Sequence, residues 1–182
     1  MKTDVVLSNE CVVLRRYRAS DVQAVYEAAR ESIAELTPWF AWAHEQSSIQ
    51  EAELFITNQA IWWDDGSVYN FAITDRTTGA YCGGCLLNHI NRGDRFANMA
   101  YWVRTSWTGK GIATAAARLV AHYGFEHLGL HRVEIIAAKE NLASIRVAEK
   151  VGAVREGVLR RRITVRDKVY DAVLFSLIPG DM

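Results

Sequence analysis

The spacing of hydrophobic and polar positions changes along the chain, and its first part predicts one strand followed by helices. Segment 11–17 is rich in Val and Leu and predicts the strand. Apolar residues then recur at helical spacing, and Ser20 or Asp21 stands where an N-cap is expected. This helical region is predicted to end near Pro38, and a second helix is predicted over 48–63.

After residue 68 the pattern becomes that of a β-sheet. Three runs rich in β-branched and aromatic residues, separated by polar turns, predict an antiparallel meander with strands at 68–74, 80–90 and 95–104. A long helix with one apolar face follows over 109–128. The last four predicted elements are a strand, a helix and two strands, at 131–138, 141–151, 154–165 and 169–177. This order predicts an α+β fold.

Composition and charge narrow the class of protein. The chain has 182 residues, half of them hydrophobic, and 21 Lys and Arg balance 21 Asp and Glu. This predicts one globular domain over residues 1–182, without the broad positive field that non-specific binding to nucleic acid or membrane surfaces requires. No apolar run reaches the roughly 20 residues of a membrane span, and no secretory signal is recognised. The chain has only three cysteines, which fits a reducing compartment, and we expect a cytoplasmic protein. From the charge balance we expect no nucleic-acid or membrane partner.

Segment 103–114 carries the most informative motif, because it joins a predicted strand directly to a predicted helix. Gly109 and Gly111 allow the backbone to approach a ligand closely. The first N–H groups of the helix have no partner within the helix. Together these features predict an anion site.

Two common phosphate-binding motifs do not fit this loop. A P-loop requires an upstream glycine, where Arg104 and Thr105 stand, and a hydroxyl residue after the lysine, where Gly111 follows Lys110. A dinucleotide-binding fingerprint requires a third glycine where Thr114 stands, within a parallel β-α-β unit. This loop instead follows a predicted antiparallel meander.

The loop resembles that of the GNAT superfamily of acyl-CoA-dependent N-acetyltransferases. That loop has Gln or Arg, two free positions, Gly, one free position, and then Gly or Ala; Thr108, Gly111 and Ala113 stand at these positions. Thr108 departs from the usual Gln or Arg. The resemblance implies that the loop amides hold the pyrophosphate of coenzyme A, with acetyl-CoA as the co-substrate and no metal.

The resemblance extends over most of the chain and is closest to the branch of ribosomal-protein N-terminal (alanine/serine) acetyltransferases. It implies a GNAT fold, whose mixed, mostly antiparallel seven-stranded sheet is flanked by helices and splayed between strands four and five. The segments that carry it are Leu14-Arg15 with Asp21, Ala97–Val103, Asn141–Ser144, Glu149–Ala153 and the closing hairpin Val154–Leu177.

The resemblance also implies which residues form the site. Ser144 is implied as the general acid for the departing thiolate, and Asn141 as a contact to the pantetheine or an ordered water. Both residues also suit the start of a helix, so a capping role explains them equally well. The implied coenzyme contacts are Tyr101, Trp102, Val103, Thr108, Gly109, Lys110, Gly111, Ile112, Ala113, Thr114, Asn141 and Ser144. The strand residues among them contribute their main chain, and the Trp102 side chain is expected in the core.

The sequence contains no clear general base. Many enzymes of this superfamily have a glutamate where Asn98 stands, and the ribosomal-protein branch has another where 160–163 reads Arg-Arg-Arg-Ile. Glu156, Asp167, Asp171 or a chain of waters are the alternatives, although carboxylates at such positions are more commonly solvated surface groups.

The missing base bears on the acceptor. At pH 7 a lysine amine, with a pKa near 10.4, costs roughly 4.6 kcal/mol to deprotonate, whereas an α-amine, with a pKa near 7.8, costs about 1.1 kcal/mol. We therefore hypothesise an α-amine acceptor, and the branch favours a protein N-terminus. The alternatives are an acetyltransferase for a polyamine, amino acid or aminoglycoside, and a non-catalytic acyl-CoA binding module. Homodimers are common in this branch by resemblance.

Three other clusters have simpler explanations. Cys82 and Cys85 have the spacing of a metal or redox pair, but only Cys11 and His89 stand as further ligands, and residues three apart on a strand point to opposite faces.

Five aromatic residues either form an acceptor wall or pack in the core, and packing is favoured. They are Trp39, Phe40, Trp42, Trp62 and Trp63. Arginines of the closing hairpin are expected at a solvated edge. They are Arg155, Arg160, Arg161, Arg162 and Arg166.

Overall fold

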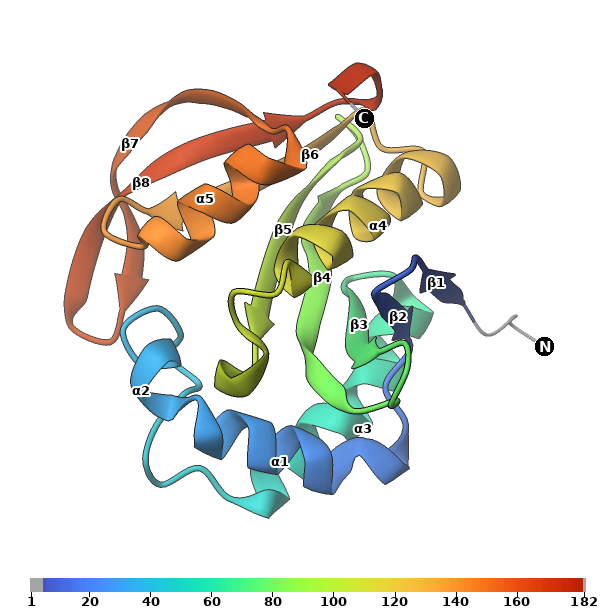
Figure 1. Cartoon of the computed structure of the whole chain (residues 1–182). Helices are drawn as coiled ribbons and strands as arrows, with labels where there is room; N and C mark the ends of the chain where they lie inside the picture. Colours follow the sequence, from blue (N-terminus) through green and yellow to red (C-terminus); the bar gives the residue numbers. More distant parts are fainter. Residues whose placement is uncertain (1–4, 182) are drawn as a thin grey trace.

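The structure is a computed structural model that describes residues 5–181, which form one mixed sheet flanked by helices (Figure 1). The strands are β1 (Val6–Ser8), β2 (Val12–Arg15), β3 (Tyr69–Asp75), β4 (Tyr81–Asn91), β5 (Phe96–Val103), β6 (Arg132–Ala138), β7 (Val154–Val165) and β8 (Lys168–Leu177). The α-helices are α1 (Val22–Glu31), α2 (Ile33–Leu36), α3 (Ile49–Asp65), α4 (Ile112–His127) and α5 (Leu142–Val151). Short 3-10 turns occupy Ala19–Asp21, Thr105–Trp107 and Pro179–Asp181.

The strand order in the sheet is β1-β2-β3-β4-β5-β6-β8-β7, and every described pair is antiparallel except β5 with β6. The predicted α+β class, the meander β3-β4-β5 and the closing hairpin β7-β8 are confirmed. The sheet has eight strands, whereas seven were expected. The extra strand is β1, whose three residues are too few to show an alternating pattern in the sequence.

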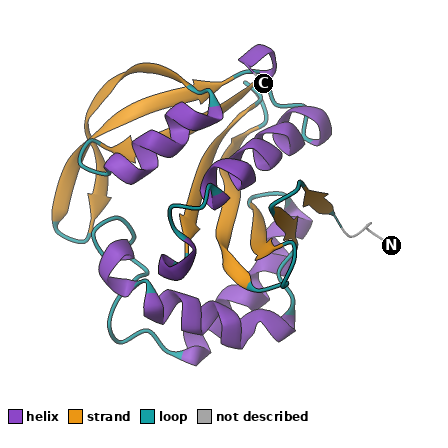
Figure 2. Ribbon diagram, in the orientation of Figure 1, coloured by secondary structure: helices purple, strands orange, loops and turns teal. Residues whose placement is uncertain are grey.

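Two apolar clusters hold the helices on the sheet. The larger lies under α4 and α5, and the fully buried residues Ala116, Ala117, Val120 and Ala121 of α4 belong to it. The smaller joins α1 and α3 to Ala72 and Tyr81 of the meander. Figure 2 shows the helices around the curved sheet in this arrangement. Among the described residues, no helix has the length and apolarity needed to cross a bilayer.

The helix starts follow local chemistry, with two corrections. Ser48 and Glu51 form a capping box at the start of α3, and Gly66, with φ of +70°, ends that helix. Asp21 precedes α1 as predicted, but its carboxylate makes no capping bond and instead accepts hydrogen bonds from Arg15 and from the Arg18 amide. Helix α4 begins at Ile112 instead of 109, because the two loop glycines adopt left-handed φ angles.

The parallel pair β5-β6 separates partway along its length, which confirms the predicted splay. The two strands pair only from Phe96 to Asn98, opposite Arg132 to Glu134. Beyond this point β6 continues to pair with β8 as far as Ala138, while β5 stays on β4. The edge of β5 that would have continued the ladder is therefore open, and the candidate site lies there.

Candidate active site

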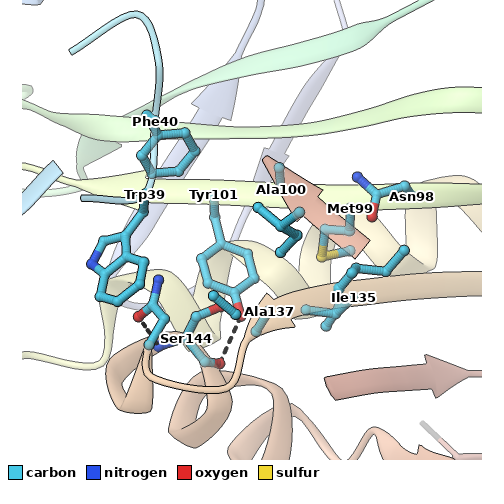
Figure 3. Close-up of a pocket in the computed structure, with 13 residues that line it drawn as sticks. Trp39, Phe40, Asn98, Met99, Ala100, Tyr101, Ile135, Ala137 and Ser144 are labelled. Carbon is cyan, nitrogen blue, oxygen red and sulfur yellow. Dashed lines mark hydrogen bonds between the residues drawn. The ribbon is translucent and has the colours of Figure 1, made fainter. Parts of the chain in front are cut away.

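A cleft lies between the diverging strands β5 and β6 (Figure 3). Its walls come from both strands, the start of α5, the segment after α2 and strand β7. The lining residues are Trp39, Phe40, Asn98, Met99, Ala100, Tyr101, Ile135, Ile136, Ala137, Ala138, Asn141, Ser144 and Ile163. The structure therefore brings together Tyr101, Asn141 and Ser144, which come from two distant parts of the sequence.

Asn141 and Ser144 form the start of α5. Asn141 is the N-cap, and its Oδ1 accepts a hydrogen bond of 3.0 Å from the Ser144 amide. The capping role expected from sequence is thus present for Asn141. The Ser144 side chain is half-buried and lies on the wall of the cleft, so capping leaves its hydroxyl available there.

The Tyr101 side chain reaches Ser144 across the cleft, a contact that was not expected from sequence (Figure 3). Its hydroxyl donates to the Ser144 carbonyl oxygen at 3.0 Å and lies 3.2 Å from Ser144 Oγ. Desolvation raises the pKa of Tyr101 far above its usual range, and the hydrogen bond with Ser144 opposes this rise only in part. The phenol therefore stays neutral at physiological pH.

The next residue of β5, Trp102, points away from this contact. The Trp102 ring packs on the opposite side of the sheet, with its centroid 5.5 Å from that of Trp42 and 6.0 Å from that of Tyr81. The expected packing role of the Trp102 side chain is confirmed. Val103 packs against the larger core cluster.

The loop before α4 presents unpaired amides. Gly109 and Gly111 have φ of +75° and +79°, and a Cβ built at either would meet no atom within 4 Å. The first bond of the helix is from the Ala115 amide to the Gly111 carbonyl. Within the described chain, no protein acceptor is bonded to the amides of residues 109–114. By contrast, the Thr108 amide is bonded to the Thr105 carbonyl at 3.1 Å, so it does not belong to this set.

Two further contacts define the loop's surroundings. Lys110 Nζ lies 4.5 Å from the ring centroid of Trp107, which holds a positive charge beside the free amides. On the upstream side, Glu31 accepts hydrogen bonds from the Ser106 amide at 2.8 Å and from Arg104 Nε at 2.5 Å. These bonds lower the pKa of Glu31. Sequence analysis missed this anchor because α1 and the loop are more than 70 residues apart.

The five aromatic residues do not all pack in the core, since Trp42 is exposed and two others line the cleft. Trp63 is buried and donates to the Asn70 carbonyl at 2.9 Å, as core packing predicts. Trp39 and Phe40 instead line the cleft, which corrects the preference for packing at these two positions. The Trp39 ring lies 5.9 Å from that of Tyr170 on β8.

None of the candidate bases lines the cleft. Glu156 is bonded to Arg132 at 2.6 Å and to Ser176 at 2.7 Å, which lowers the pKa of Glu156 to about 2. Asp171 accepts from the Arg161 amide at 2.8 Å. Asn98 lines the cleft, and its Nδ2 donates to Asn88 at 2.8 Å. Among the described residues that line the cleft, Tyr101 is the one with a titratable side chain.

Cys82 and Cys85 lie buried on β4 as free thiols, and burial raises the pKa of Cys82 to about 11. Thiols that resist ionisation in this way are poor nucleophiles and metal ligands. In the part of the chain that the structure describes, no group of His, Cys, Asp and Glu is arranged to hold a metal ion.

Comparison with known proteins agrees with this geometry. The sequence model of the Acetyltransferase (GNAT) domain matches residues 12–154. YdaF of Bacillus subtilis, provisionally named a ribosomal N-acetyltransferase, is 30% identical over 177 residues, which are 93% of this chain and 92% of YdaF.

Solved structures share the whole fold. One from Vibrio cholerae, provisionally described as a ribosomal-protein-serine acetyltransferase, has a TM-score of 0.86 at 28% identity and covers 98% of this chain and 100% of its own. RimL, a ribosomal L7/L12 α-N-protein acetyltransferase solved with coenzyme A, has a TM-score of 0.86 at 20% identity, covering 96% and 98% of the two chains. The fold and the cleft define an acyl-transfer protein built around a splayed sheet. The chain belongs to the GNAT family of N-acetyltransferases.

Proposed function

We propose that this protein transfers the acetyl group of acetyl-CoA to the α-amine of a protein N-terminus. The observation that carries the proposal is the chemistry of the cleft, in which the described lining offers a serine hydroxyl and no carboxylate, imidazole or thiol. Such a site suits an amine that reaches it already neutral.

The free amides of residues 109–114 suit the pyrophosphate of coenzyme A, since helix N-termini and adjacent amides bind anions. The left-handed glycines leave the backbone open to a ligand, and Lys110 adds a positive charge. We assign the pyrophosphate to this loop.

The open edge of β5 suits the pantetheine arm, which adds to a sheet edge as a further strand does. Main-chain groups of Tyr101, Trp102 and Val103 are available along this edge, because β6 has diverged from it. The arm then leads from the loop to the cleft, where a strand amide polarises the thioester carbonyl. Ser144 serves as the general acid for the thiolate, and Asn141 holds the turn on which Ser144 stands.

The acceptor assignment follows from proton chemistry and from the relatives. An α-amine loses its proton at pH 7 for about 1.1 kcal/mol, against roughly 4.6 kcal/mol for lysine. The described cleft lining contains no base that could take the proton from a lysine amine. The names of YdaF and of the V. cholerae protein both point to ribosomal proteins, and the wall of Trp39 and Phe40 offers an apolar surface for a first side chain.

An acceptor screen tests the proposal. Release of the coenzyme A thiol is measured with peptides that have a free α-amine, with the same peptides blocked at the N-terminus but carrying a lysine, and with polyamines, amino acids and aminoglycosides. We expect turnover with the free α-amines. Turnover with the lysine peptides or small amines alone, or binding of acetyl-CoA without turnover, contradicts the assignment.

The same screen tests Ser144. We expect Ser144→Ala to lower kcat by around 10²-fold, as loss of a general acid typically does, with the KM for acetyl-CoA nearly unchanged. Ser67→Ala is the control, since Ser67 is exposed, does not line the cleft and bonds locally to Asp65 and Trp62.

A further inference from the structure

We infer that Tyr101 is a positioning residue for proton transfer: its phenol holds the Ser144 hydroxyl and donates a hydrogen bond to Ser144 Oγ when that hydroxyl gives up its proton. The inference rests on the proposed function, in which Ser144 supplies the proton to the leaving sulfur. It concerns the tyrosine side chain, whereas the family resemblance gives Tyr101 only a main-chain contact.

The geometry places two acceptors within reach of one donor. The Tyr101 hydroxyl lies 3.0 Å from the Ser144 carbonyl oxygen and 3.2 Å from Ser144 Oγ. When the phenol donates to the carbonyl, its oxygen is free to accept from the serine hydroxyl. When the serine hydroxyl turns to the sulfur, the phenol is placed to donate to Oγ instead. A small rotation of one O–H bond thus changes between the two arrangements.

The rest of the serine is already fixed. The Ser144 amide is held by Asn141 Oδ1 at 3.0 Å, and Ser144 lies within the first turn of α5. The Tyr101 ring is itself packed against the larger core cluster, so the phenol cannot easily move away. Asn141 therefore holds Ser144 at its amide, and Tyr101 holds it at its carbonyl and hydroxyl. Figure 3 shows the contact with Tyr101.

The proton count closes without an added base. A neutral amine attacks the thioester carbonyl, the nitrogen–carbon bond forms and the carbon–sulfur bond breaks. Ser144 gives its hydroxyl proton to the sulfur and takes one proton from the acylated nitrogen, so the serine ends as it began. Tyr101 keeps its proton throughout. Because desolvation disfavours the phenolate, Tyr101 acts as a hydrogen-bond donor and not as the acid.

The test compares the kcat of the single variants Tyr101→Phe and Tyr123→Phe. Both are assayed with the acceptor that the screen shows to be preferred. Tyr123 is a matched control because it is buried on α4 and its hydroxyl makes no hydrogen bond to a described residue. We expect Tyr101→Phe to lower kcat by roughly 5- to 10-fold, the effect of losing one hydrogen bond. The KM for acetyl-CoA and the affinity for coenzyme A should not change, and both also report that the variant is folded. Equal activity of the two variants overturns the inference.

A double variant separates positioning from a structural role. Because Tyr101 acts through the serine, Tyr101→Phe should have no further effect on kcat in the Ser144→Ala background. If the two effects multiply, Tyr101 does not act through Ser144 and the inference is wrong. If Ser144→Ala alone keeps full activity, the proposed role of Ser144 fails first. If Ser144→Ala lowers kcat and Tyr101→Phe does not, this inference is wrong while the proposed function stands.

Discussion

Arg166, at the turn between β7 and β8, donates from Nη1 to the carbonyl oxygen of Thr37 at a distance of 2.9 Å, across 129 residues of sequence. Its Nη2 also donates to the Ala43 carbonyl at 2.5 Å. These two carbonyls bracket the segment that carries Trp39 and Phe40. Arg166 is exposed, as expected of the hairpin arginines, and it also ties the closing hairpin to the wall of the cleft.

We expect Arg166→Met to weaken acceptor binding. Methionine keeps much of the aliphatic length but removes every hydrogen bond to the 37–43 segment, and bonds from a charged donor are each worth about 1.5 kcal/mol or more when shielded from water. Since Arg166 is exposed, we expect a smaller sum, equivalent to roughly a tenfold rise in the acceptor KM. Arg166→Lys should lie between the variant and the wild type.

Steady-state kinetics with each substrate varied in turn provide the check. The KM for acetyl-CoA should be unchanged, because the loop at 109–114 does not contact Arg166. Arg162→Met is the control, since Arg162 is exposed and its guanidinium has no partner among the described residues. A matching loss in both variants, or a change confined to acetyl-CoA, would show that the hairpin does not hold the acceptor wall.

A second prediction concerns Gly111, whose φ of +79° is one that side chains other than glycine rarely adopt. Gly111→Ala should cost about 1 kcal/mol of local strain and crowd the free amides. We therefore expect roughly a five- to tenfold loss of coenzyme A affinity, measured by calorimetry.

Gly129→Ala is the matched control for this variant. Gly129 has a φ of +64° and equally open surroundings, but it lies beyond the far end of α4. It should lose similar stability and keep its affinity. Equal affinity losses in the two variants would remove the loop from the binding site.

Much of this fold could be predicted from local pattern. The β-branched and aromatic runs of β3, β4 and β5 and the apolar face of α4 each depend on residues close in sequence, and each was found within a few residues of its expected position. The start of α4 was placed three residues early, because apolar spacing does not show that Gly109 and Gly111 leave the helical φ range. The cap at Asn141 was predictable, since it depends on residues three apart.

The contacts that shape the cleft could not be predicted in the same way. Tyr101 meets Ser144 only because β5 and β6 diverge, and Arg166 meets Thr37 only because the hairpin curves back over α2. The sequence offers one signal for the first of these: alternation in β5 places Tyr101 on the same face as Ala97 and Met99, towards α4 and α5. No comparable signal exists for Arg166, which stands in the charged turn Arg166-Asp167-Lys168.

A third prediction concerns acid stability. Arg132 and Ser176 lower the pKa of Glu156 to about 2, so the folded state favours its charged form. The resulting stability is fully present above the ordinary glutamate pKa, near 4.3, and is lost as the pH falls towards 2. Because Glu156 is more than a third exposed, we expect less than about 1 kcal/mol. Denaturant unfolding at pH 6 and pH 3 should show a smaller decrease for Glu156→Gln than for the wild type. Equal decreases would mean that the ion pair adds nothing.

The last prediction concerns the pH dependence of acetyl transfer. The cleft lining has no described group that titrates between pH 5 and 9, because burial keeps Tyr101 protonated. The acceptor amine must then arrive neutral, so kcat/KM should rise tenfold per pH unit up to the pKa of the amine itself, near 7.8 for an α-amine, and level off above it. Two peptides that differ in an electron-withdrawing substituent on the first residue provide the measurement, since their amines titrate at different pH. The break in the profile should move with the amine. A break that stays at one pH for both peptides would reveal a base on the enzyme and would remove the chemical reason for preferring an α-amine to a lysine.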